Sequence, residues 1–235
     1  MVCTEDHECL SNECTDGFCC DVACAGECEA CAAALSGGTD GVCSFIPTGN
    51  DPENECGVGS HCNGAGVCLG GDGEPCAAGG ECLSGNCADD VCCTTACNGP
   101  CESCVLLYTG VADGACAPVV AYEDPDGECA LGSSCDGANT CKKNDGQLCG
   151  GAGECITGQC VDGVCCDQIC GGTCRSCLGA DTGGLDGDCA YASFGLDPDT
   201  ECGAGLRCDG SGVFKNLDGQ GGGDDSKCLS DNCAY

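Results

Sequence analysis

The chain has 235 residues, 37 cysteines, no tryptophan and a formal net charge of −33. Six Lys and Arg residues against 39 Asp and Glu residues cannot neutralise a phosphate backbone, so the charge excludes nucleic acid as a partner. No apolar run approaches the ~18 residues of a membrane-spanning helix, so membrane insertion is not expected. Leu, Ile, Val and Phe are too few for an ordinary apolar core, so covalent or metallic links must replace it.

The cysteines follow a period of 73 residues along the whole chain. Adding 73 to each of the first twelve cysteines reaches another cysteine every time, and adding 146 does so except at Phe214. Those twelve are Cys3, Cys9, Cys14, Cys19, Cys20, Cys24, Cys28, Cys31, Cys43, Cys56, Cys62 and Cys68. The period predicts segment 1 (1–75), segment 2 (76–148), segment 3 (149–221) and a partial fourth repeat (222–235).

Few regular elements are expected within each segment. The stretch AGECEACAAAL (25–35) is the best helix candidate, although its counterparts carry Gly and Pro, which oppose a helix. The stretches NGAG (63–66), DGAN (136–139) and DGSG (209–212) predict tight turns between short strands. The expected fold is small and disulfide-rich: tandem 73-residue repeats of short β-strands, turns and loops, stacked into an elongated rod.

Dense cysteines indicate disulfides, a metal–thiolate site or a redox pair, and disulfides fit this sequence best. Two histidines, His7 and His61, do not recur with the period, and thiolate clusters would add charge to an acidic chain. The Cys-x-x-Cys pairs, such as Cys28/Cys31, lie beside acidic residues and lack the helix N-terminus that activates a thiol. Disulfides in turn favour an oxidising compartment, either extracellular or periplasmic.

The irregular end of the chain suggests a pairing. Phe214 and Gly222 replace two cysteines together, which predicts that the intact counterparts bond as Cys68–Cys76 and Cys141–Cys149 across the segment borders. A change confined to residues 213–227 explains the same loss. Cys228 and Cys233 are also expected in disulfides. Cys3 is then left over, which predicts an intermolecular bond or an upstream repeat.

Carboxylates recur in the segments NDPENEC, EDPDGEC and LDPDTEC. They offer possible calcium ligands, namely Asp51, Glu53, Glu55, Asp124, Asp126, Glu128, Asp197, Asp199 and Glu201. The alternative is an Asp-Pro turn with a solvated acidic rim. Calcium is therefore a possible cofactor, and no other metal or cofactor site is expected. The carboxylates lack the apolar pocket that would separate their pKa values, so an enzyme is not expected.

The pattern C-x5-C-x4-C-x4-C-C-x3-C-x3-C-x2-C, followed by DP-x-x-EC and C-(D/N)-G, covers almost the whole chain in three copies. It resembles the cysteine-rich tandem repeats of large predicted secreted or surface proteins of bacteria, and more remotely EGF-like and knottin-like modules. The resemblance implies an extracellular or cell-surface location and no known activity.

The constant segment length carries the functional expectation. An array that must stack at constant rise tolerates length changes poorly, whereas a binding protein tolerates them well. We expect a structural subunit of an extracellular, disulfide-stabilised filament or surface appendage, self-associating head to tail. A secreted adhesive or ligand-binding repeat array is the alternative, and metal–thiolate storage is a more distant one.

Overall fold

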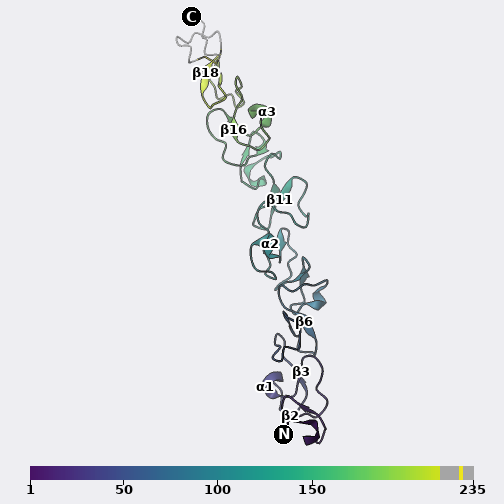
Figure 1. Cartoon of the computed structure of the whole chain (residues 1–235). Helices are drawn as coiled ribbons and strands as arrows, with labels where there is room; N and C mark the ends of the chain where they lie inside the picture. The colour runs from purple at the N-terminus through teal and green to yellow at the C-terminus, as the bar shows by residue number, and fades with distance from the viewer. Residues whose placement is uncertain (218–227, 230–235) are drawn as a thin grey trace. The chain divides into compact units, whose positions relative to one another are not determined.

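The computed structural model describes residues 1–217, 228 and 229 (Figure 1). It divides into two compact units, Met1–Val119 and Val120–Tyr235. The border between these units falls inside segment 2, so it does not coincide with the borders expected from the cysteine period.

Strands of two or three residues pair antiparallel in two-stranded sheets. Three such sheets follow one another in the same order three times along the described chain. The first pairs are β1 (Cys14–Thr15) with β2 (Phe18–Cys19), β7 (Cys87–Ala88) with β8 (Val91–Cys92), and β13 (Cys160–Val161) with β14 (Val164–Cys165). The second pairs are β3 (Glu29–Ala30) with β4 (Ser44–Phe45), β9 (Glu102–Ser103) with β10 (Ala117–Pro118), and β15 (Arg175–Ser176) with β16 (Ala190–Tyr191). The third pairs are β5 (Ser60–Cys62) with β6 (Cys68–Gly70), β11 (Ser133–Cys135) with β12 (Cys141–Lys143), and β17 (Leu206–Cys208) with β18 (Phe214–Asn216).

The third pairs contain the three predicted tight turns, which are confirmed. The first residue of each turn accepts two backbone N–H groups beyond it; Asn63 Oδ1, for example, accepts from Ala65 at 2.8 Å and Val67 at 3.2 Å. Asp136 and Asp209 do the same in the other two turns. An Asx side chain thus closes each hairpin, as the sequence pattern requires.

The helices of the described residues are single turns. The α-helices are α1 (Ala33–Ser36), α2 (Leu106–Thr109) and α3 (Gly179–Thr182), and the 3-10 helices are η1 (Asp6–Glu8), η2 (Gly79–Glu81) and η3 (Ala152–Glu154). The predicted helix over 25–35 is therefore mostly wrong. Cys28 has a left-handed backbone with φ of 61°, which breaks a helix there, and left-handed Gly37 ends α1.

Disulfides take the place of an apolar core. In segment 1 they are Cys3–Cys14, Cys9–Cys19, Cys20–Cys31, Cys24–Cys43, Cys28–Cys62 and Cys56–Cys68. Segment 2 has Cys76–Cys87, Cys82–Cys92, Cys93–Cys104, Cys97–Cys116 and Cys129–Cys141 at matching positions. Segment 3 has Cys149–Cys160, Cys155–Cys165, Cys166–Cys177, Cys170–Cys189 and Cys174–Cys208. A bond that closes a loop of this size contributes about 3 kcal/mol in the chain-entropy account.

Neighbouring disulfides also pack on one another. The Sγ atom of Cys28 lies 3.5 Å from those of Cys56 and Cys68, and the buried Ile46 belongs to the same cluster. Sulfur atoms and the aliphatic side chains of Ala30, Ile46 and Leu35 thus form a small core where the sequence offers few large apolar residues.

The predicted bonds across the segment borders are wrong. Cys68 bonds Cys56 and Cys76 bonds Cys87, so each partner lies in its own segment. The same holds for Cys141 and Cys149, which bond Cys129 and Cys160. The reason is the hairpin: it turns Cys68 back beside Cys62, toward the disulfide-rich interior of its own segment.

The prediction that Cys3 is left over is also wrong, because Cys3 bonds Cys14. The cysteine that remains unpaired in the described part of the chain is the buried Cys202. Its counterparts Cys56 and Cys129 bond the position that Phe214 occupies in segment 3. Gly222 and Cys233 lie outside the described residues, whereas Cys228 is disulfide-bonded.

Candidate functional site

The candidate calcium ligands begin with an aspartate that closes a turn in each segment. Asp51 accepts the backbone N–H groups of Glu55 at 2.9 Å and Cys56 at 3.2 Å. Asp124 holds the matching pair of N–H groups, and Asp197 holds that of Cys202 at 3.1 Å. These three carboxylates are used by their own turns, which supports the Asp-Pro turn over a ligand role for them.

The last acid of each motif has a structural partner as well. Glu55 Oε2 accepts the backbone N–H of Cys28 at 2.9 Å, and Glu201 accepts that of Cys174. Cys28 and Cys174 are fully buried and have a left-handed backbone, so their N–H groups need a partner there. Glu128 and Asp126, the corresponding acids of segment 2, also have polar partners.

The middle acid meets an aspartate that lies far away in the sequence. Burial, then the charge of Asp16 and a hydrogen bond with it, and then Glu55 and Asp51, raise the pKa of Glu53 to about 7. In segment 3, burial and the neighbouring Asp162 raise the pKa of Asp199 in the same way. The Glu53 carboxyl therefore binds a proton near neutral pH, and Asp199 keeps its proton to a higher pH than an ordinary aspartate does.

Asp16 and its counterparts are site residues that the sequence reasoning missed. Asp16 Oδ2 accepts the backbone N–H of Cys31 at 2.6 Å, and Asp89 and Asp162 accept those of Cys104 and Cys177 at 2.9 Å. The signal was present, since an aspartate recurs ahead of each Cys-Cys pair, in DGFCC, DDVCC and DGVCC. Its meaning depends on a fold that brings it beside the later acidic motif.

The carboxylate oxygens of these clusters fit a calcium site only in part. Each cluster offers carboxylate oxygens, the ligands that calcium prefers, yet several of those oxygens already accept backbone N–H groups. A proton and a cation would compete for the pair Asp16–Glu53. Calcium therefore stays a prediction.

The cysteines offer no comparable metal site in the described residues. Sulfur triads such as Cys28, Cys56 and Cys62 lie close together, but these sulfurs are already in disulfides and are not thiolates. The Cys-x-x-Cys residues bond elsewhere: Cys28 bonds Cys62 and Cys31 bonds Cys20. These cysteines therefore form structural disulfides, as predicted, and not redox couples.

A hollow lies between α1 and the loop before β5 in segment 1. Its volume is about 910 Å³, and its lining includes Leu35, Pro47, Asp51 and His61. The Asp51 carboxylate in this lining already accepts backbone N–H groups, and the lining also includes the polar residues Asn50, Asn54 and Ser60.

The segments join through backbone hydrogen bonds. The N–H of Leu83 donates to the carbonyl oxygen of Gly70 at 2.8 Å, and Ile156 donates to Lys143 at 3.0 Å. Leu229 donates in the same way to Asn216, at 3.0 Å. The same contact therefore occurs at all three borders. The residue after the second cysteine of a segment (Cys82, Cys155 or Cys228) donates to the last strand of the segment before it.

No family model, curated protein or solved structure matches the chain. Among the described residues, no helix is long and apolar enough to cross a membrane.

Proposed function

We propose that the chain is a structural subunit of an extracellular, disulfide-stabilised filament or surface appendage that assembles head to tail. The observation that carries the proposal is the border contact made by Leu83, Ile156 and Leu229, each of which donates to the third hairpin of the segment before it. A contact that repeats along one chain is the kind that repeats between chains in a polymer.

The disulfides support the extracellular part of the proposal. Such bonds persist in oxidising compartments and are rare in the reducing cytosol. The density of bonds would keep each subunit folded outside a cell, where the chain has few apolar residues to stabilise it. The resemblance to repeats of secreted and surface bacterial proteins agrees with this location, and we propose it as the family setting.

Imaging in negative stain tests the proposal. We expect uniform fibres from concentrated native protein, and single chains after guanidinium without reductant, because the observed disulfides lie within the chain. A non-reducing gel should then show one band at the mass of the single chain. Separate particles at every concentration would contradict a filament.

The hollow beside His61 favours a second candidate, a secreted ligand-binding or adhesive repeat array. The hollow is of the size of small-molecule sites, about 300–1,000 Å³. A ligand screen followed by NMR would detect shifts of the His61 ring and the Leu35 methyl groups if this candidate were right. A filament subunit with no ligand would leave these signals unchanged.

A further inference from the structure

The hollow beside His61 has a smaller neighbour at the border between segments 1 and 2, the first border. The volume of this smaller hollow is about 430 Å³, within the range of small-molecule sites, about 300–1,000 Å³. Gly49 and His61 line both hollows. The lining of the smaller one also includes Gly71, Asp72, Leu83 and Thr94, and all of these residues lie in the unit Met1–Val119.

A tyrosine side chain lies at the corresponding place of the border between segments 2 and 3, the second border. Tyr122 is the counterpart of Gly49, and Asp145 is the counterpart of Asp72, at the constant offset of 73 residues. The Tyr122 hydroxyl donates to Asp145 Oδ2 at 3.2 Å. Tyr122 therefore extends from the position of Gly49 to that of Asp72.

The surroundings of the Tyr122 hydroxyl match the walls of the smaller hollow. Burial, then the charge of Asp145 and a hydrogen bond with it, and then the charge of Asp167, raise the pKa of Tyr122. Asp167 is the counterpart of Thr94, a second lining residue. The hydroxyl at the second border is thus close to the counterparts of two residues that line the hollow at the first.

The space that Tyr122 fills is open at Gly49. A Cβ atom on Gly49 would meet no atom within 4 Å beyond its chain neighbours. The backbone has the same left-handed form at both positions, with φ of 84° at Gly49 and 74° at Tyr122. The first border therefore has the backbone of the second without its ring.

The imidazole of His61 takes part in a wall that an amide completes at the second border. A Cβ atom on Gly71 would lie 3.5 Å from His61 Nε2, so the imidazole stands close to this glycine. Their counterparts are Ser134 and Asn144, and Asn144 Nδ2 donates to Ser134 Oγ at 3.1 Å. The two borders thus keep the wall and differ in the ring that it faces.

We propose that the smaller hollow binds a phenol ring whose hydroxyl donates to the Asp72 carboxylate, with His61 and Leu83 beside the ring. The hydrogen bond from Tyr122 to Asp145 is the corresponding contact at the second border. The site extends the ligand-binding candidate to a second hollow and does not depend on the filament.

Charge agrees with a neutral ligand. Segment 1 has 14 acidic residues and no Lys or Arg, so it repels carboxylates and phosphates. A phenol hydroxyl has a pKa of about 10, so it is neutral at physiological pH and still donates a hydrogen bond to a carboxylate.

Titration of the full-length, disulfide-bonded protein with phenol, followed by NMR, tests the site. We expect saturable shifts of the His61 ring and Leu83 methyl signals. The Kd should lie in the millimolar range, because Tyr122 stays 49% exposed at the second border and much of a bound ring would also face water. Benzene, which lacks the hydroxyl, should bind at least about fivefold more weakly.

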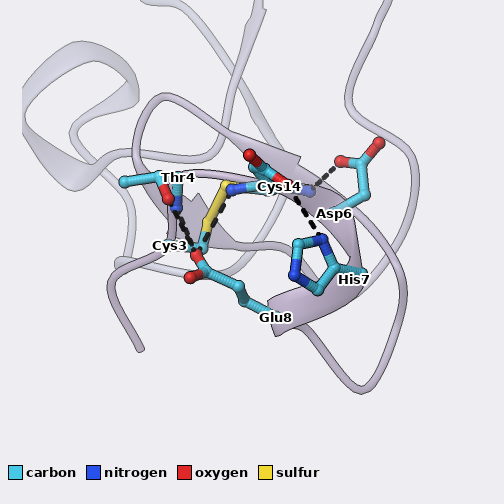
Figure 2. A network of polar contacts seen from close by, with 7 residues as sticks. Cys3, Thr4, Asp6, His7, Glu8 and Cys14 are labelled. Atoms are coloured by element: carbon cyan, nitrogen blue, oxygen red, sulfur yellow. Dashed lines mark hydrogen bonds and ion pairs between the residues drawn. A yellow bond between two sulfur atoms is a disulfide. The ribbon is translucent and has the colours of Figure 1, made fainter.

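His7, the other histidine of the chain, is the internal reference for these shifts. Its Nδ1 lies 3.0 Å from Glu5 Oε2, in a polar network where Asp6 accepts the Cys14 N–H at 2.9 Å (Figure 2). His7 does not line either hollow, so its ring signals should stay in place.

Three variants locate the ring. In Gly49→Tyr, phenol should no longer shift the His61 signals, because the new side chain fills the hollow. Gly17→Tyr is the matched control: Gly17 has φ of 80° and open space at its Cβ position, but it lies in the turn between β1 and β2. Tyr122→Gly should open a second site, so that phenol then shifts the side-chain amide signals of Asn144.

N-acetyltyrosinamide identifies the source of the ring. Binding at least as tight as that of phenol indicates a tyrosine side chain of a peptide or protein, and weaker binding indicates a small free phenol.

Three results would overturn the phenol site: benzene binding as tightly as phenol, phenol still shifting His61 in Gly49→Tyr, or no saturable shift of His61 and Leu83 in the wild type. Shifts of Leu35, which lines the larger hollow alone of the two, without shifts of Leu83 would overturn it too. That last result would leave the ligand-binding candidate standing.

Discussion

At the scale of single residues, the unpaired Cys202 is the clearest departure from the regular cysteine pattern. Burial, then a hydrogen bond with Asp197, raises the pKa of this thiol to about 11. A buried thiol of this kind is almost wholly protonated at neutral pH, so it reacts slowly. Phe214 occupies the position of its missing partner.

Alkylation should therefore single out Cys202. We expect almost no labelling of the native protein by iodoacetamide at neutral pH, and labelling of Cys202 once guanidinium is added without reductant. Peptide mapping by mass spectrometry identifies the labelled residue. Labelling of Cys3 in place of Cys202 would contradict the Cys3–Cys14 disulfide. An intermolecular disulfide at Cys3 would then be a prediction again.

The proton shared by Glu53 and Asp16 makes the folding stability depend on pH with the opposite sign to that of an ordinary ion pair. The pKa of Glu53 is raised from 4.5 to about 7, so the folded state binds more protons than the unfolded state between these values. Stability from this pair is therefore present at acidic pH and is lost as pH rises through about 7. The Glu53 carboxyl is only slightly buried and the residue as a whole is exposed, so water screens the effect and we expect less than about 1 kcal/mol.

Carbon-detected NMR of the carboxyl groups measures this directly. The Glu53 carboxyl should titrate near neutral pH, and Asp16→Asn should lower the pKa of Glu53 by removing the neighbouring negative charge. Glu27→Gln, at an exposed site, serves as the control. Calcium should lower the apparent pKa of Glu53 if the cluster binds it, and an unchanged titration in excess calcium would exclude that role.

At the scale of elements, the three third hairpins differ in one covalent link. The Cys56–Cys68 and Cys129–Cys141 bonds attach β6 and β12 to their segments, whereas β18 begins with Phe214 and has no such bond. The lost bond would close a loop of 12 residues' separation and contribute about 3 kcal/mol. The β17–β18 hairpin should accordingly open more readily than the other two.

Hydrogen exchange tests this comparison. We expect the β17–β18 amides to exchange roughly a hundredfold faster than those of β5–β6, since about 1.4 kcal/mol corresponds to tenfold. Phe214→Cys should form a bond to Cys202 and slow the exchange to the rate of β5–β6. Equal protection of all three hairpins in the wild type would show that the Phe214 side chain replaces the disulfide fully.

At the scale of the whole molecule, the sequence predicted that the cysteines form disulfides and where tight turns lie. It did not predict which cysteines pair. Tight turns such as NGAG depend on residues next to one another, so local chemistry specifies them. Pairing depends on where a hairpin points: Cys68 lies closer in sequence to Cys76 than to Cys56, yet the hairpin brings it to Cys56. The hydrogen bond between Asp16 and Glu53 could not be predicted either, because no local sequence pattern indicates that two acids 37 residues apart are neighbours.

The net charge of −33 sets the conditions under which copies can meet. Segment 1 has 14 acidic residues and no Lys or Arg, and the rest of the chain is also negative on balance, so two copies repel at a distance. Raising the ionic strength from about 0.01 M to 0.15 M shortens the screening length from roughly 30 Å to 8 Å. This repulsion between copies should weaken accordingly, so we expect sedimentation to show stronger association with added NaCl. Weaker association with added NaCl would contradict this expectation and would mean that attraction between opposite charges outweighs the repulsion.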